Sequence, residues 1–171
     1  MGRIYGAAMY EGVIAEAIQA LKFHDKHRLA IPLGELLREF AAEHMAVEAY
    51  DFIIPVPLHR VRFRERGYNQ SALLAEECAA AFPKARVCHD LKRIRPTRTQ
   101  SKVVGDKRAD NVRGAFAVTG DQLAGTRILL VDDVVTSGGT VIECARALRR
   151  AKAAHVDVLA VALVEHRAAR T

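Results

Sequence analysis

The stretch that most constrains the fold of this chain is residues 127–140, which read RILLVDDVVTSGGT. A run of branched apolar residues leads there into two adjacent acids, Asp132 and Asp133. So short an apolar run, stopped by a polar turn, is typical of a buried strand in a parallel sheet. In open α/β sheets, ligands bind beyond the carboxyl ends of the strands, where we expect the two acids to emerge. The stretch therefore predicts an α/β domain with a ligand site at this strand end.

The turn after the acids, Thr136–Thr140, is rich in glycine and hydroxyl groups, and a helical pattern follows it. Successive backbone N–H groups of such a turn converge on one point, and the next helix adds the positive end of its dipole. That geometry binds phosphate. Because carboxylates beside a phosphate would repel it, cations or sugar hydroxyls must lie between them. A phosphorylated sugar with Mg²⁺ is the simplest ligand that satisfies both halves.

Two other interpretations compete with this one. An apolar strand ending in Asp-Asp also opens the receiver domains of response regulators, where the acids hold Mg²⁺ beside a phosphorylated aspartate. That pair lies near the N-terminus and is not followed by such a turn, whereas here it begins at position 132 of 171. The other alternative is a strand that ends in a solvated acidic turn, since motif matches always carry a false-positive risk.

The segment Val131–Thr140 resembles the phosphoribosyl-pyrophosphate (PRPP) motif of type I phosphoribosyltransferases, with its hydrophobic residues, two acids, threonine and small residues in register. The resemblance extends over about residues 20–165 to the ComF (competence-associated) branch of that family. The similar segments are Val56–Arg60, Arg66–Gln70, Arg98–Gln100, Arg108 with Asn111, and Gly114–Phe116. The resemblance implies the type I phosphoribosyltransferase fold, an α/β fold whose twisted, mainly parallel sheet is flanked by helices and carries a small hood. Many ComF-type proteins also begin with a cysteine-rich zinc ribbon, and this sequence contains no such segment.

The resemblance implies a reaction as well, the transfer of phosphoribose from PRPP to an unidentified acceptor with release of pyrophosphate and with Mg²⁺ as cofactor. Cleavage of the anomeric C–O bond develops positive charge on the ribose and negative charge on pyrophosphate, so preorganised charge supplies most of the catalysis. We find no clear general base and no acceptor pocket in the sequence.

By the same resemblance, each part of the substrate has its own set of residues. Asp132 and Asp133 hold the ribose hydroxyls, directly or through Mg²⁺, and act as catalytic residues together with Arg98 and Lys102. The 5′-phosphate lies on Val135, Thr136, Ser137, Gly138, Gly139 and Thr140. The leaving pyrophosphate faces His59, Arg60, Arg62, Arg64, Lys107 and Arg108, and the supporting residues are Arg66, Asn69, Gln70, Gln100 and Asn111. Lys22 and Phe23 are connected to the site by family likeness alone, and we predict no role for them.

Two basic segments supply the cations. Four arginines alternate with other residues over 59–66, directly after an expected strand over 51–58, and arginine suits bidentate phosphate recognition. An exposed, extended segment with a solvated basic face is the alternative. Lys92–Arg113 holds eight basic residues and two acids, with few apolar residues to pin it down. It predicts a lid that is mobile when empty and that closes over the substrate and excludes water.

Apolar periodicity predicts the remaining elements. Helices are expected over about 10–23, 29–44, 71–82 and 141–152, and further strands over 85–89 and 156–164. Asn69 is expected to cap the helix that begins near Ser71. We therefore predict a single domain over 1–171, with a helical hood or N-terminal part over about 1–50 and a core over 51–165.

Composition limits the cellular compartment in which the protein is expected and the kinds of partner that it can bind. The net charge of +6 attracts nucleic acid and polyphosphate ligands alike. Cys78, Cys88 and Cys144 lack Cys-x-x-Cys spacing, so we expect no disulfide framework and no zinc, and a reducing cytoplasm fits best. No run reaches the roughly 20 apolar residues that a membrane span needs.

Two functions remain open at this point. One is a PRPP-dependent transferase, and the other is a non-catalytic PRPP- or nucleotide-binding regulator or a DNA-uptake (competence) accessory protein. Contact with DNA or with the competence machinery stays open, as does a homodimer.

Overall fold

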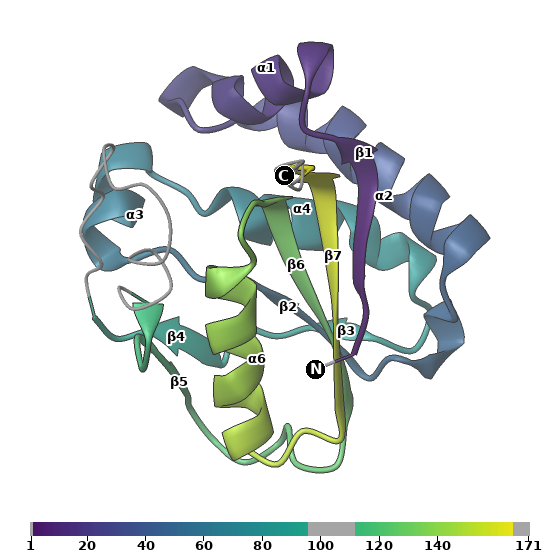
Figure 1. Ribbon diagram of the computed structural model, residues 1–171, viewed down its shortest axis with the longest axis vertical. Helices are drawn as coiled ribbons and strands as arrows, with labels where there is room; N and C mark the ends of the chain where they lie inside the picture. Colours follow the sequence, from purple (N-terminus) through teal and green to yellow (C-terminus); the bar gives the residue numbers. More distant parts are fainter. Residues whose placement is uncertain (1, 96–111, 166–171) are drawn as a thin grey trace, which may run out of the picture.

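A five-stranded sheet forms the centre of the protein (Figure 1), in a computed structural model that describes residues 2–95 and 112–165. The strand order is β1-β7-β6-β2-β3, and every neighbouring pair is parallel. The predicted α/β fold with a mainly parallel sheet is therefore confirmed. The strands are β1 Ile4–Met9, β2 Phe52–Pro55, β3 Arg86–Val87, β6 Arg127–Val135 and β7 His155–Leu163. A separate antiparallel pair joins β4 Leu91–Arg93 to β5 Phe116–Val118.

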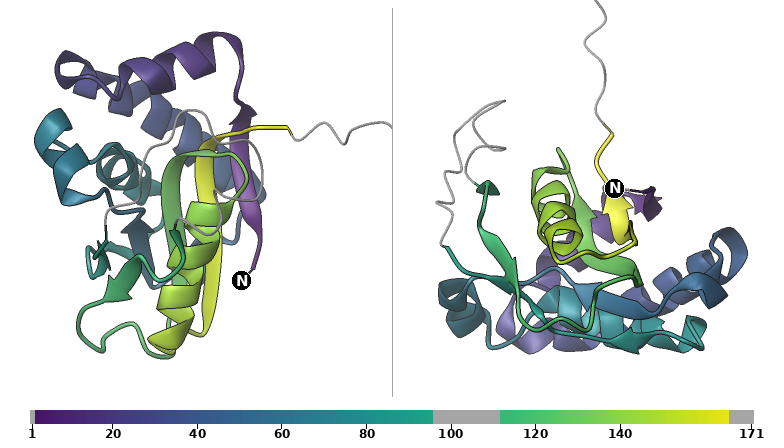
Figure 2. Two further views of the ribbon diagram at one scale, coloured as in Figure 1. Left: turned by 60° about the vertical axis from the view of Figure 1, so that its left-hand side comes forward. Right: turned by 90° about the horizontal axis from the view of Figure 1, so that it is seen from below.

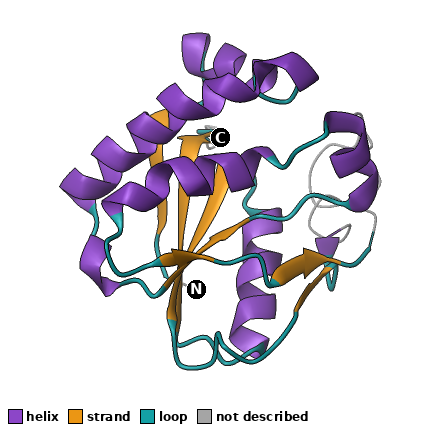
Figure 3. Ribbon diagram, turned by 180° about the vertical axis from the view of Figure 1, so that it is seen from behind, coloured by secondary structure: helices purple, strands orange, loops and turns teal. Residues whose placement is uncertain are grey.

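Helices cover both faces of the sheet (Figures 1 and 2). Helices α2 and α4 cross the back of the sheet, as Figure 3 shows, and α6 lies on the front, while α1 spans the edge where β6 and β7 end. The helices are α1 Gly12–Ala20, α2 Ala30–His44, α3 Arg60–Arg66, α4 Gln70–Cys78 and α6 Gly139–Arg150. Short 3₁₀ turns are η1 His24–Leu29, η2 Val47–Ala49 and η3 Ala79–Ala81. Within residues 2–95 and 112–165, no helix is both long enough and apolar enough to cross a membrane.

Strand β6 shows why its sequence is almost continuously apolar. Ile128 and Leu130 pack in the cluster that includes α6, whereas Leu129 and Val131 pack in the cluster beneath α2 and α4. Neighbouring residues of a strand face opposite sides of the sheet, so a sheet covered on both faces needs apolar residues at both sets of positions. The helix expected near Ser71 does begin there, because the Asn69 side chain caps α4 by accepting a hydrogen bond from the Ser71 N–H.

The N-terminal part is not purely helical, which corrects the predicted hood over 1–50. Ile4–Met9 forms β1, which pairs in parallel with β7 at the edge of the core sheet. Gly6 permits this approach, because a Cβ atom there would lie 2.2 Å from the Leu163 side chain. The helical part consists of α1, η1, α2 and the short turn η2. The short β1 segment reads IYGAAM and lacks a clear period of its own, and its pairing with β7 depends on the far end of the chain.

The extended segment that was the alternative for the alternating arginines does not form. Arg60–Arg66 form α3, which ends at Gly67 with a left-handed φ of 81°. Strand β6 does not end before the acids either. It continues through them to Val135, because β7 offers pairing partners as far as Leu163.

Candidate functional site

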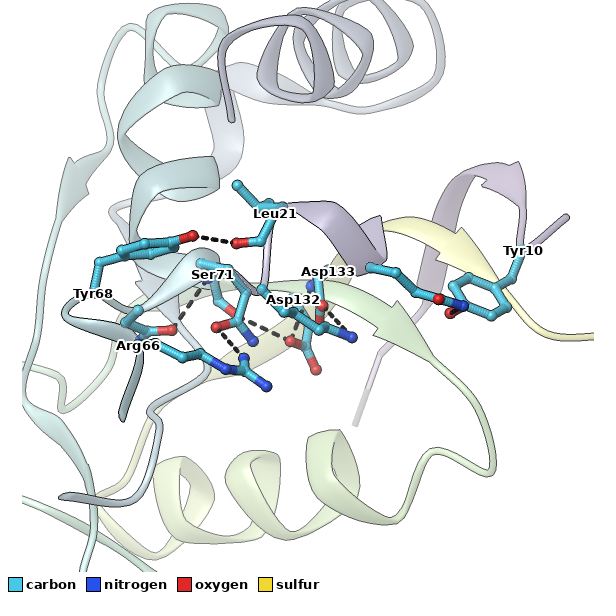
Figure 4. A network of polar contacts seen from close by, with 11 residues as sticks. Tyr10, Leu21, Arg66, Tyr68, Ser71, Asp132 and Asp133 are labelled. Carbon is cyan, nitrogen blue, oxygen red and sulfur yellow. Dashed lines mark hydrogen bonds and ion pairs between the residues drawn. The ribbon is translucent and has the colours of Figure 1, made fainter. Parts of the chain in front are cut away.

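The two acids of β6 lie in different surroundings (Figure 4). The Asp132 carboxylate accepts hydrogen bonds from Ser71 Oγ at 3.0 Å and from the Asp133 N–H at 2.9 Å. The Asp133 carboxylate instead forms an ion pair with Lys22, whose Nζ lies 2.8 Å from Oδ2. Both acids are buried, at 8% and 4% exposure. Adjacent strand residues point to opposite faces, so the pair presents two separate carboxylates rather than one twin ligand.

The turn after β6 has the form expected of a phosphate cradle. Gly138 adopts a left-handed φ of 76° and is the N-cap of α6, which begins at Gly139. A cavity of about 60 Å³ is enclosed by Asp132, Val134, Val135 and the predicted phosphate turn as far as Val141. Asp133 is not among its lining residues. The fold therefore brings one carboxylate and the N-terminus of a helix to the same small cavity.

Positive groups from three elements approach the acids. Lys22 follows α1, Arg66 ends α3, and Arg93 ends β4, where its guanidinium lies 5.5 Å from the centre of the Phe116 ring. Burial lowers the pKa of Arg66, while the charge of Asp133 acts in the opposite direction. Burial likewise lowers the pKa of Arg93, and Cys144 and then Asp132 oppose it. The acids thus sit in a predominantly positive surrounding.

The buried position of Asp132 makes its carboxyl group hard to ionise. Burial raises the pKa of Asp132 well above its usual value, and the Asp133 carboxylate adds to the effect. The Asp133 N–H and the Ser71 hydroxyl act against it. A buried carboxylate that is costly to ionise and lines a cavity is a common mark of a binding or catalytic group.

The basic segment after β2 opens onto a second, larger cavity of about 850 Å³ between α3, the start of α4 and β4. His59 caps α3 through Nδ1, which accepts a hydrogen bond from the Val61 N–H at 3.3 Å. His59, Arg60 and Arg64 all line this cavity, whereas Arg62 forms an ion pair with Glu65 at 3.0 Å. None of the lining residues named for the larger cavity also lines the smaller one. Three of the predicted pyrophosphate residues, His59, Arg60 and Arg64, therefore line one cavity, and the predicted 5′-phosphate residues line another.

The supporting residues that the structure describes connect the start of α4 to the segments before it. The Asn69 side-chain amide donates to the Val56 carbonyl at 3.0 Å, which ties the start of α4 to the end of β2. Arg66 donates to the Gln70 side chain at 2.8 Å. The remaining predicted residues lie outside the described part of the chain, so their roles stay predictions: Arg98, Gln100, Lys102, Lys107, Arg108 and Asn111.

Three residues that lie near the acids in the fold were given no role from the sequence, namely Lys22, Ser71 and Arg93, and of these only Lys22 had a connection to the site, by family likeness. Lys22 is a single lysine after an amphipathic helix, and Ser71 is one hydroxyl in a helix start, so neither carries a local signal. Arg93 was visible only as one of many basic residues in its segment. Each of them reaches the acids from another part of the chain.

The carboxylates of the site can hold Mg²⁺ only together with oxygen ligands from a bound substrate. Among the residues that the structure describes, no three His, Cys, Asp or Glu side chains lie together as a metal-binding group. Mg²⁺ is commonly held by one or two carboxylates together with substrate phosphates and water. Asp132, at the cavity, can contribute in that way. Asp133 already has a cation, Lys22, on its carboxylate.

Comparison with known proteins gives consistent results for family and fold. The model of the phosphoribosyl transferase domain family matches residues 70–171, more than half of the chain. Competence protein F of Haemophilus influenzae is 32% identical over 151 residues, which cover 85% of this chain and 66% of that protein. DNA utilization protein YhgH of Salmonella typhimurium is 33% identical over 159 residues, which cover 91% of this chain and 70% of that protein. This chain thus spans about two thirds of the length of these relatives.

Among solved structures, the glutamine PRPP amidotransferase from Bacillus subtilis, complexed with ADP and GMP, superposes with a TM-score of 0.58. The match covers 86% of this chain and 30% of that one at 22% identity, so it supports the fold alone. The strand–acid–turn–helix unit, the parallel sheet and the relatives agree. The chain belongs to the phosphoribosyltransferase family with the type I fold, and within that family to the ComF branch.

Proposed function

We propose that this chain binds PRPP with Mg²⁺ and transfers its phosphoribosyl group to an acceptor, with release of pyrophosphate. The observation that carries the proposal is that Asp132 and the turn before α6 line one cavity. A carboxylate there accepts hydrogen bonds from sugar hydroxyls, while the backbone N–H groups of the turn and the α6 dipole bind a phosphate on the same sugar.

In this proposal the residues of the chain act chiefly by position and charge. The Thr136–Thr140 turn anchors the 5′-phosphate, and Asp132 orients the ribose. Arg60, together with His59 and Arg64 on the larger cavity, attracts the departing pyrophosphate. Bound Mg²⁺ supplies further neutralisation of the pyrophosphate charge. The acceptor attacks the anomeric carbon, the bond to the pyrophosphate oxygen breaks, and its electron pair leaves with pyrophosphate.

The test combines binding with chemistry. Calorimetry at saturating Mg²⁺ should give tighter binding for PRPP than for either ribose 5-phosphate or pyrophosphate, because PRPP occupies both phosphate regions at once. A panel of nucleobases and amines is then assayed for pyrophosphate release above the rate of PRPP hydrolysis. Binding without release for every acceptor would favour a non-catalytic binder. No difference among the three ligands would contradict the PRPP site itself.

A second candidate function is single-stranded nucleic-acid binding along the larger cavity. Its named lining residues include no acid, and its basic side chains, such as Arg64 and Lys92, lie beside Phe63 and Ile94, which are 50% and 60% exposed. Basic and apolar groups side by side are suited to phosphates and bases together. Relatives named for competence and for DNA utilization favour the same partner class.

Fluorescence anisotropy with a labelled single-stranded oligonucleotide tests this candidate. The logarithm of the affinity should fall linearly with the logarithm of salt concentration, by roughly 0.7 for each phosphate contacted. Arg64→Ala should weaken binding and reduce that slope, whereas Arg38→Ala on α2, away from the cavity, should leave both unchanged. Equal effects of the two variants, or a slope near zero, would remove this function. PRPP competition reports whether the two ligands share the cavity.

A further inference from the structure

Lys22 holds the Asp133 carboxylate from outside the core sheet. Its Nζ lies 2.8 Å from Asp133 Oδ2, and the two side chains are 26% and 6% exposed. Lys22 comes just after α1, in a turn closed by a hydrogen bond from the Lys22 N–H to the Gln19 carbonyl at 3.0 Å. The ion pair therefore joins the helical N-terminal part to the strand that carries the acids.

The segment around Lys22 is fixed by Tyr68 (Figure 4). The Tyr68 hydroxyl lies 2.6 Å from the Leu21 carbonyl oxygen and 2.6 Å from the Phe23 carbonyl oxygen, so its hydrogen can serve either. Tyr68 follows Gly67, the residue at which α3 ends. The carbonyls on both sides of the lysine are thus hydrogen-bonding partners of Tyr68, which follows α3.

The charges around the acids explain why this ion pair matters for a metal ion. Two carboxylates are approached by three cationic side chains, Lys22, Arg66 and Arg93. A divalent ion at Asp133 would stand within a few ångströms of the ammonium, where like charges repel strongly at the low effective dielectric of a buried site. The Lys22 ammonium and a divalent cation are therefore alternatives on this carboxylate.

We propose that Lys22 is an internal cation that occupies Asp133 in place of a metal ion, and that Tyr68 holds it there. The free protein then presents one open carboxylate, Asp132, and its affinity for divalent ions is kept low until a phosphorylated ligand brings further oxygen ligands. If the Lys22–Asp133 ion pair were merely structural, removing Lys22 would change only the stability of the fold. If Lys22 competes with metal, removing it also changes the affinity for divalent ions. The inference rests on the proposed function only in taking the acid pair as the place where ribose and metal meet.

The first experiment uses Mn²⁺ alone, with electron paramagnetic resonance to count the bound ion in the full chain. Lys22→Met should raise the Mn²⁺ affinity by roughly tenfold or more, since changes in the groups that contact metal ligands typically alter affinity by that factor. Lys22→Arg keeps the charge and should bind Mn²⁺ as weakly as the wild type. Tyr68→Phe loosens the lysine and should shift the affinity in the same direction as Lys22→Met, but less.

The matched control is Lys84→Met, which removes a lysine from an exposed ion pair with Glu48 at 3.0 Å. It should leave Mn²⁺ affinity unchanged. Thermal unfolding is measured for every variant, and if Lys22→Met does not fold, Tyr68→Phe decides the question. Equal Mn²⁺ affinity in the wild type, Lys22→Met and Tyr68→Phe would overturn the proposal.

A second arm measures PRPP affinity by calorimetry as Mg²⁺ is varied. PRPP affinity should rise with Mg²⁺ in the wild type, and Lys22→Met should bind PRPP more weakly in EDTA but gain more from Mg²⁺ than the wild type does. An unchanged Mg²⁺ response in Lys22→Met would contradict the proposal. If no variant binds PRPP at any Mg²⁺ concentration, the proposed function fails, and the Mn²⁺ measurement still decides the role of Lys22.

Discussion

Asp132→Asn should lower PRPP affinity by roughly 100-fold, because a hydrogen bond to a charged group contributes about 1.5–3 kcal/mol and the carboxylate faces the cavity. The measurement is calorimetry with PRPP and Mg²⁺. The same substitution should stabilise the fold by about 1 kcal/mol, which is typical when a strained functional group is relieved. Binding and stability are expected to move in opposite directions.

The stability gain follows from the surroundings of the carboxyl group. Asp132 is buried beside a second carboxylate, and its pKa in the folded protein is raised. Because the folded value lies above the unfolded one, ionisation at neutral pH favours the unfolded chain, and an amide that cannot ionise removes that cost. The amide can still accept the hydrogen bond from Ser71.

The control is Asp121→Asn, an exposed acid in the loop before β6. It should change neither PRPP affinity nor the midpoint of unfolding. Asp132→Asn that retains wild-type PRPP affinity would remove this carboxylate from the binding site. A marked loss of stability would show that the charge of Asp132, despite its burial, is needed by the fold.

Asp157→Ala should destabilise the protein by about 3 kcal/mol, because three donors lose a buried, charged acceptor. The Arg3 N–H, the Tyr50 hydroxyl and His155 Nε2 lie 2.6, 2.8 and 2.9 Å from its carboxylate oxygens. Tyr50 is itself 3% exposed, so its hydroxyl would be left without this partner in the core. Urea denaturation at pH 7 measures the loss.

The same carboxylate should produce a pH dependence of stability. Burial by itself would raise the pKa of Asp157, but the hydrogen bonds from Arg3, Tyr50 and His155 lower it below its usual value. A depressed folded pKa stabilises the protein above the unfolded value of about 3.9, and this contribution disappears as the pH falls through the folded pKa. The wild type should therefore lose stability below about pH 4 more steeply than Asp157→Asn does.

Asp157 also separates folding from binding. It lies near the start of β7, whereas the candidate site lies at the far end of β6 and the turn that follows. Below its melting temperature, Asp157→Asn should bind PRPP as the wild type does, the opposite of the pattern for Asp132→Asn. If Asp157→Asn and Asp132→Asn change stability and PRPP affinity in the same way, the surroundings of Asp157 and the candidate site do not act separately.

Much of the site could be predicted because its main unit is local. Strand, acids, turn and helix follow one another within residues 127–150, so apolar pattern, turn composition and helix periodicity are enough to predict each of them. The Asn69 cap of α4 is local in the same sense, since its side chain bonds to a backbone group two residues away. The helical state of the alternating arginines in α3 was not predictable from their pattern alone. That helix depends on a cap from His59 and a stop at Gly67.

The sequence by itself determined that a parallel α/β sheet carries two acids into a phosphate-type turn, because these signals lie within one short segment. The tertiary structure alone decided what each acid contacts. Asp132 opens into the cavity beside Ser71, and Asp133 is bound by Lys22, a residue far away in the chain. The edge position of β1 is likewise set by its pairing with β7. Contacts between distant segments depend on how helices pack on the sheet, and no local pattern of residues encodes that arrangement.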